Sequence, residues 1–237
     1  MAYTASRTTN GFELIGNLLN VTDNGREYEL TPNTAFKKGD MVVLTTGKIA
    51  LAAANATNVV GVMAESIAQA DNPADGITFG KVYDNPFNIY RCSFADHKDA
   101  TATGGTTTTL IDTDLATSDN DVWNGALLYI YEGTNAGCIR TVTDYVGGTD
   151  TLHFQAMPAA CDTTSKYILL GNAGKAGDVI NVGTAGIDLK DENTIDANAA
   201  VIDANTSAEK GPLAALAINP ANLTMDVLIR KHLFNTN

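Results

Sequence analysis

Short apolar segments separated by turn residues restrict the fold of this chain more than any other feature. The 237 residues include 21 glycines, and Thr, Asn and Asp recur every few positions between the apolar runs. An amphipathic helix needs apolar residues at three- and four-residue spacing over ten or more positions, and these interruptions leave no long stretch of that kind. Short strands joined by many turns suit the pattern. We therefore predict an all-β protein with sandwich or barrel-like sheets.

Two segments far apart in the chain share a strand-turn-strand pattern. GDMVVLTTGKIAL, residues 39–51, places Thr46-Gly47 at the bend, and GDVINVGTAGIDL, residues 177–189, aligns with it without a gap. Each copy precedes a further apolar segment, at residues 59–66 and 212–219. A true repeat would make each copy a β unit whose apolar face needs cover, whereas chance similarity between two Gly-Asp hairpins would carry no such meaning. Both interpretations stay open at this point.

The block between these copies differs in composition and predicts an inserted domain. It opens with a Thr-rich linker at residues 100–110. We predict a small β domain at residues 97–171, inserted into an outer β domain formed by residues 12–96 and 172–237. Residues 1–11 are polar and aperiodic, which predicts an extended N-terminal arm.

Several strands are predicted inside the insert. Residues 126–131 are apolar on both faces, and residues 139–145 and 151–157 flank a Gly-containing hairpin loop. Trp123, the only tryptophan, is predicted to close the core of this block.

Two further local patterns lie towards the ends of the chain. Asp23-Asn24-Gly25 is typical of a tight hairpin, because these residues tolerate positive φ. Residues 219–234 fit either a helix that starts at Pro220 or a strand in which Met225, Val227 and Ile229 alternate with polar residues. We favour the strand.

Charge and targeting signals narrow the range of partners. Fifteen Lys and Arg against 27 Asp and Glu give a net charge of −12, which repels a phosphate backbone, so no nucleic-acid partner is expected. The N-terminus lacks the basic and apolar regions of a secretory signal, and no run of about 18 apolar residues occurs. We expect synthesis in the cytosol and no membrane partner. Cys92, Cys138 and Cys161 lack a CxxC spacing and are interpreted as small buried apolar residues.

No motif in the sequence predicts an enzyme. His97, His153 and His232 stand outside any nucleophile or zinc motif, and the Gly-containing turns do not match a phosphate-binding loop. Carboxylates between Asp112 and Asp121 could supply oxygen ligands to calcium. That segment lacks the Gly and terminal Glu of an EF-hand loop, so we favour a solvated turn. We expect no catalytic residue, no metal site and no cofactor.

Three stretches resemble proteins of bacteriophage heads. Residues 36–66, a Gly-Asp hairpin followed by small residues and a VVGV strand, look like the capsid decoration (cement or head auxiliary) proteins of tailed phages. Residues 105–145 resemble a β module of phage structural proteins, and DVLIRKHLF, residues 226–234, resembles the ending of head decoration proteins. The resemblance implies a homo-oligomer, often a trimer, that binds the outer face of the shell near its local threefold axes and bridges neighbouring major capsid proteins. The smallest family members lack an insert, which implies an additional contact here.

The same resemblance implies a virion protein of the outer capsid surface, made in the host cytoplasm, with the major capsid protein and other copies of itself as partners. Candidate capsid contacts are Tyr3, Phe12, Leu14 and Ile15, which we expect to order on the shell. A merely frayed terminus is the alternative. Other functions considered are a tail-fibre or receptor-binding component, a glycan-degrading enzyme and a bacterial surface-layer protein.

Overall fold

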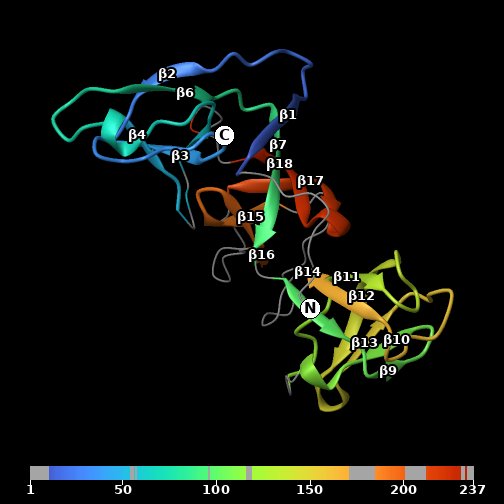
Figure 1. Ribbon diagram of the computed structural model, residues 1–237. Helices are drawn as coiled ribbons and strands as arrows, with labels where there is room; N and C mark the ends of the chain where they lie inside the picture. Colours follow the sequence, from blue (N-terminus) through green and yellow to red (C-terminus); the bar gives the residue numbers. More distant parts are fainter. Residues whose placement is uncertain are drawn as a thin grey trace.

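The computed structural model describes residues 11–53, 56, 58–95, 97–115, 119–170, 185–200, 212–230 and 233 (Figure 1). Within these residues, eighteen strands form three sheets, and the only helical segments are single 3₁₀ turns. The 3₁₀ turns are η1 (Gln69–Asp71), η2 (Thr113–Leu115), η3 (Gly147–Thr149) and η4 (Pro220–Asn222). The all-β prediction is confirmed.

A five-stranded sheet lies at one end of the molecule (Figure 1). Its strands, in the order β2-β6-β5-β3-β4, are β2 (Arg26–Glu29), β6 (Phe79–Tyr83), β5 (Val59–Met63), β3 (Met41–Thr45) and β4 (Lys48–Leu51). The hairpin predicted over residues 39–51 is confirmed, since β3 pairs with β4 in antiparallel register. Thr46 and Gly47 both have positive φ, at 50° and 84°, as a two-residue turn between twisted strands requires.

A six-stranded sheet occupies the middle of the molecule (Figure 1). It contains β1 (Glu13–Asn17), β7 (Asn88–Ala95), β15 (Ala185–Asp191), β16 (Thr194–Ala200), β17 (Leu213–Asn219) and β18 (Thr224–Ile229). Its pairings run from β7 through β16, β15, β17 and β18 back to β7, so the sheet curls onto itself. β18 confirms the strand predicted near the C-terminus, and Pro220 starts only the single turn η4.

The hairpin predicted at Asp23-Asn24-Gly25 is wrong. β1 pairs with β7 and β2 pairs with β6, so the chain between them crosses from the six-stranded to the five-stranded sheet. Gly25 does take a positive φ of 70°, but the turn serves this crossover.

The two similar Gly-Asp segments are paired differently. β15 contains the counterpart of β4, while residues 177–184, which include the counterpart of β3, lie outside the described residues. β5 pairs with β3, whereas β17 pairs with β15. The described strands therefore do not form two equivalent units.

A seven-stranded sheet makes up the third unit (Figure 1). Its order is β8 (Lys98–Thr101), β14 (Lys166–Leu170), β11 (Leu127–Glu132), β12 (Ile139–Val146), β13 (Thr151–Phe154), β10 (Thr109–Ile111) and β9 (Gly104–Gly105). β8 and β9 are consecutive in the chain yet end the strand order on opposite sides, so the sheet is rolled. Trp123 is 5% exposed in the core of this unit, as predicted. The strands β11, β12 and β13 confirm those predicted in the insert, whose domain limits stay a prediction.

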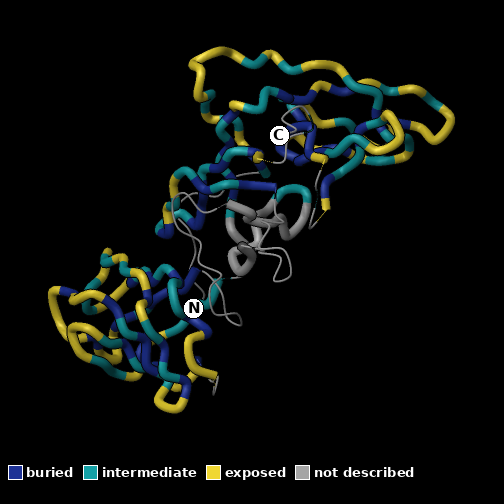
Figure 2. Tube along the Cα trace, turned by 180° about the vertical axis from the view of Figure 1, so that it is seen from behind, coloured by how far each residue is buried: buried dark blue, intermediate teal, exposed yellow. Residues whose placement is uncertain are grey.

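Two strands of the seven-stranded unit pack on both faces, and the second face of β11 is only partly buried. In β14, Tyr167 and Leu169 pack in the core of the insert, whereas Ile168 and Leu170 pack with residues of the other two sheets. β11 follows the same alternation, which accounts for its apolar residues on both faces. Figure 2 shows these strands as dark blue and teal stretches, while the yellow exposed loops lie farther out. The seven-stranded unit therefore docks on the rest of the protein through an apolar strand face.

Candidate functional site

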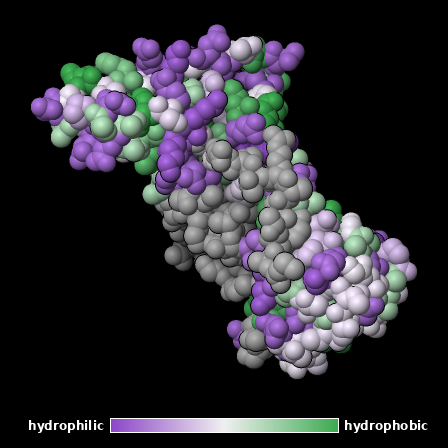
Figure 3. Space-filling model, viewed as in Figure 1, coloured by the Kyte–Doolittle hydropathy of each residue, from purple (hydrophilic) through white to green (hydrophobic). Residues whose placement is uncertain are grey.

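Exposed apolar side chains gather where the chain crosses from β1 to β2. Leu18, Leu19 and Val21 are 53%, 59% and 49% exposed, and Phe87, from the connection between β6 and β7, is 43% exposed. The Leu18 amide donates to the Phe87 carbonyl oxygen at 2.9 Å, which joins the two connections. We call these four residues the crossover patch. Figure 3 shows hydrophobic residues among hydrophilic ones at the end of the molecule that carries β2 and β6.

The crossover patch is held in place by Asn17. Its side-chain oxygen accepts a hydrogen bond from the Leu19 amide at 2.8 Å, and its side-chain nitrogen donates to Asn88 Oδ1 at 2.9 Å. Asn20, in the middle of the patch, has a φ of 54°, which asparagine tolerates better than most residues. Leu18 and Leu19 are thus presented to solvent by a braced turn.

Asp23 anchors the crossover beside the patch. Its Oδ1 accepts from the Gly25 amide at 2.8 Å, and its Oδ2 accepts from Asn88 Nδ2 at 2.6 Å and from the Asn85 amide at 3.2 Å. Hydrogen bonds to a carboxylate are stronger than those between neutral groups. One acidic residue therefore fastens the crossover to the connection between β6 and β7.

Beneath Asp23 lies a buried polar chain. Asn88, 1% exposed, also donates to the Tyr90 hydroxyl at 3.0 Å, and that hydroxyl donates to the Tyr83 carbonyl oxygen at 3.0 Å. Tyr90 is fully buried, and its burial raises the pKa of its phenol well above the usual value. Because each of these groups has a partner, this series of hydrogen bonds makes the buried layer beneath the crossover rigid.

The buried phenol of Tyr90 leads to a prediction about alkaline stability. Tyrosine in an unfolded chain ionises near pH ~10, and the raised pKa in the fold means that the folded state keeps its proton to higher pH. The contribution of Tyr90 to stability is therefore intact below about pH 10 and is lost as the pH rises further. Urea unfolding at a series of alkaline pH values is expected to show a smaller loss for Tyr90→Phe than for the wild type. An equal loss in both proteins would contradict this role.

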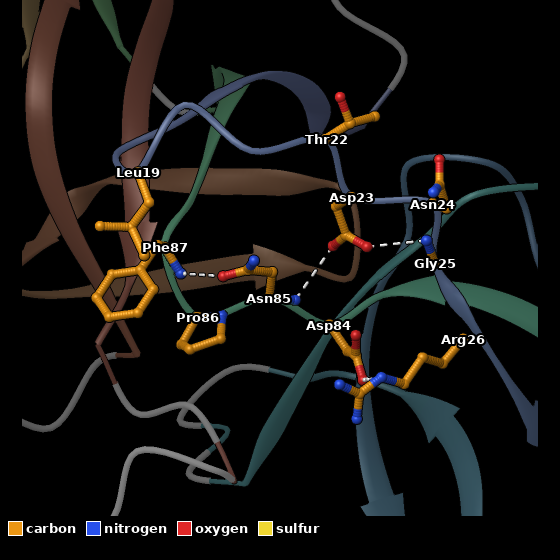
Figure 4. Close-up of a pocket in the computed structure, with 10 residues that line it drawn as sticks. All are labelled: Leu19, Thr22, Asp23, Asn24, Gly25, Arg26, Asp84, Asn85, Pro86 and Phe87. Atoms are coloured by element: carbon orange, nitrogen blue, oxygen red, sulfur yellow. Dashed lines mark hydrogen bonds and ion pairs between the residues drawn. The ribbon is translucent and has the colours of Figure 1, made fainter.

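A pocket opens between the Asp23 crossover and the end of β6 (Figure 4). Its volume is about 490 Å³, and its lining includes Asp23, Arg26, Asp84, Asn85 and Phe87. Its other lining residues are Leu19, Thr22, Asn24, Gly25 and Pro86.

Asp84 forms one wall of this pocket and is only 5% exposed. Its Oδ2 accepts from the Tyr28 hydroxyl at 2.6 Å and lies 3.5 Å from Arg26 Nε. Burial, followed by the hydrogen bond to Asp84, raises the pKa of Tyr28. The Arg26 side chain is 74% exposed, so its contact with Asp84 is weak and leaves most of the guanidinium open to solvent.

The predicted capsid contacts occupy different environments. Tyr3 lies outside the described residues. Phe12 is 2% exposed in the core, and its amide donates to the Gly39 carbonyl oxygen at 2.8 Å, so its inclusion as a surface contact was wrong. Leu14 packs partly against the same core, and Ile15 is 39% exposed on β1. Of the three that the structure describes, Ile15 alone is an exposed apolar side chain.

Most of the crossover patch was missed from the sequence. Leu18 and Leu19 belong to the first apolar segment, and the Asn residues on either side of them are a usable sign of an exposed turn. Phe87 carries no such sign, because its place beside Leu18 depends on pairing between segments about seventy residues apart.

The other residues considered for chemistry serve the fold where the structure describes them. Asp112 is fully buried and accepts from the Tyr167 hydroxyl at 2.6 Å, so it is not part of a solvated turn. Cys92 and Cys161 are buried and Cys138 is partly buried, all as free thiols. His153 is half-buried on β13, and His232 lies outside the described residues. Among the described residues, no group of three His, Cys, Asp or Glu side chains could hold a metal ion.

Comparison of the chain with models of protein families, with curated proteins and with solved structures gives no match. None of the helical segments in the described part is long and apolar enough to cross a bilayer. A functional assignment therefore depends on the crossover patch, the adjacent pocket and the resemblance of the three stretches.

Proposed function

We propose that the protein is a structural virion protein, a capsid decoration or cement protein that binds the outer surface of a phage head and stabilises contacts between major capsid proteins. The crossover patch is the observation that carries this proposal. Four large apolar side chains stand exposed on two connections that a hydrogen bond joins, and Asn17 braces the one that carries Leu18 and Leu19. Contiguous exposed apolar residues ringed by polar ones are typical of protein interaction sites. The partner that we propose, the major capsid protein, comes from the resemblance of residues 36–66, 105–145 and 226–234 to phage head proteins.

A preformed patch favours binding to a shell. Because Asn17 and Asp23 already fix the turn, little conformational entropy is lost when the patch docks. A molecule that spans the joint between two capsid subunits adds contacts that must break before the shell opens. Occupancy then raises shell stability by mass action. This mechanism needs no catalytic group and agrees with a homo-oligomer, proposed to be a trimer, that contacts several shell subunits at once.

The position of the insert suggests an orientation on the shell. The crossover patch lies where the six- and five-stranded sheets meet, and the seven-stranded unit extends from the other side of the six-stranded sheet (Figure 1). Docking through the patch would direct the insert away from the shell. In this proposal the outer domain binds the capsid and the insert is displayed.

Binding to capsids that lack the protein tests the proposal. Wild-type protein is expected to give ordered density at symmetry positions of the shell when the mixture is imaged by electron cryo-microscopy. Leu18→Asp combined with Leu19→Asp is expected to bind at least about tenfold more weakly, because two charges would have to be desolvated at the contact. Ile77→Asp is the matched control, since Ile77 is 72% exposed and lies outside the patch.

Three outcomes would count against this function. Density confined to the tail would favour a fibre or receptor-binding component, and absence of added density would reject capsid binding. Equal binding by the Leu18/Leu19 variant and the Ile77 control would reject the crossover patch as the contact surface.

A further inference from the structure

The pocket beside the crossover patch shares Leu19 and Phe87 with it, but the rest of its lining is mostly polar. It places carboxylate, amide and guanidinium groups around a hollow of about 490 Å³. That volume lies within the range of roughly 300–1,000 Å³ usual for small-molecule sites. A flat shell contact would leave this hollow unfilled, so shell binding alone does not account for it.

The polar groups of the pocket are fixed before any ligand arrives. Asp23 is held by the Gly25 amide, the Asn85 amide and Asn88 Nδ2. The side-chain oxygen of Asn85 accepts from the Phe87 amide at 3.0 Å, which leaves both N–H donors of that amide group for a ligand. Figure 4 shows Asp23 directed at the Gly25 and Asn85 amides, and Asn85 directed at the Phe87 amide. The arrangement combines acceptors and donors at fixed positions.

A sugar residue is the class of molecule that matches this lining. Its hydroxyl groups both donate and accept, so they can pair with Asp23 oxygens and with the N–H groups of Asn85 and Arg26. Its ring also has an apolar C–H face, which packs on an aromatic ring. Phe87 is 43% exposed at the pocket edge, with Leu19 beside it (Figure 4). The hollow thus has one apolar wall and several hydrogen-bonding groups.

Charge restricts which sugar fits. Two carboxylates, Asp23 and Asp84, and one guanidinium, Arg26, line the pocket, and the whole chain carries a net charge of −12. An anionic sugar would meet repulsion from both carboxylates and from the protein as a whole. We propose that this pocket binds a single neutral sugar residue.

The pocket is arranged for binding and not for cleavage of a glycan. Asp23 accepts three hydrogen bonds from the fold, and Asp84 Oδ2 accepts from the Tyr28 hydroxyl and faces Arg26. Glycoside hydrolysis needs two carboxyl groups that both act on the scissile bond, whereas both of these carboxylates are already engaged by groups of the fold. The pocket would therefore hold a sugar residue without cleaving its glycosidic bond.

Saturation-transfer NMR with separate sugars tests the site. The probes are D-glucose, D-galactose, D-mannose and N-acetyl-D-glucosamine, with N-acetylneuraminic acid as the anionic arm. At least one neutral sugar is expected to receive saturation from the wild-type protein, and the anionic sugar is expected to receive none. Arg26→Ala is expected to weaken that binding several-fold, and Phe87→Ala to abolish it. Phe79→Ala is the matched control, because Phe79 is 56% exposed on β6 and does not line the pocket.

Two results would overturn the sugar site. The first is the absence of saturation transfer to every neutral sugar, and the second is binding that survives both Phe87→Ala and Arg26→Ala. Arg26 lies outside the crossover patch, so Arg26→Ala is expected to bind capsids like the wild type. Wild-type protein that binds capsids but no neutral sugar would reject the sugar site alone, and wild-type protein that binds a neutral sugar but no capsid would reject the proposed function alone.

Discussion

Replacement of Ile168 by alanine is expected to lower the free energy of unfolding by about 2–5 kcal/mol, the usual cost of truncating a large buried aliphatic side chain. Ile168 is fully buried on the face of β14 that packs against residues of the other two sheets. Its loss would leave a cavity where the insert docks on the outer domain. Urea unfolding followed by far-UV circular dichroism and by the fluorescence of Trp123 measures the effect in the whole protein and in the insert.

Two further variants show which face of β14 matters. Leu169→Ala removes a side chain from the core of the insert and is expected to cost a similar amount, because Leu169 is also fully buried. Ile139→Ala is the surface control and is expected to change stability by no more than about 0.5 kcal/mol, since Ile139 is 41% exposed. A loss below about 1 kcal/mol for Ile168→Ala would show that this face is not packed against the outer domain.

Replacement of Gly61 by alanine is expected to destabilise the protein by about 3 kcal/mol or more, at the upper end of the usual cost of overpacking. A Cβ atom on Gly61 would lie 1.9 Å from the Tyr83 carbonyl oxygen and 2.8 Å from its carbon. Both are backbone atoms, so the clash cannot be relieved by turning a side chain. The expected fall in Tm is roughly 6 °C or more, measured by differential scanning calorimetry.

The matched control for Gly61 is Gly104→Ala. No atom lies within 4 Å of a Cβ built on Gly104, which also sits in a strand. It is expected to keep a Tm close to that of the wild type. Gly61→Ala should also disturb the pocket, because Asp84 follows Tyr83 directly and its Cα would lie 3.1 Å from the new methyl group. A Gly61→Ala protein as stable as the Gly104→Ala protein would contradict the close approach of β5 to β6.

Local patterns predicted the strands well, because whether a segment forms a strand depends mainly on a few consecutive residues. The alternation of Leu152 and Phe154 with polar neighbours, and the Thr46-Gly47 turn, needed no knowledge of distant segments. Pairing between distant segments could not be predicted in the same way. Asp23-Asn24-Gly25 has the composition of a hairpin turn. However, β1 pairs with β7 and β2 pairs with β6, so the segment connects two different sheets.

The candidate site was predicted only in part for the same reason. Phe12 and Ile15 belong to the same short apolar segment, yet Phe12 packs in the core beside Gly39, whereas Ile15 on β1 is exposed. Asp23 and Asp84 line the same pocket because β2 pairs with β6. No local motif in the sequence predicts that pairing. The function itself follows from the crossover patch together with the resemblance, and stays a proposal.

The pairing of β8 with β14 has a consequence for how such a protein can change. Lys98 lies opposite Leu169, so the first and last strands of the seven-stranded unit lie side by side. A different module could therefore occupy this place without stretching the outer domain, provided that its last strand offers side chains like Ile168 and Leu170 to the waiting apolar surface. The seven-stranded unit is in this sense exchangeable. A replacement would have to reproduce the contacts that Ile168 and Leu170 make with the other two sheets.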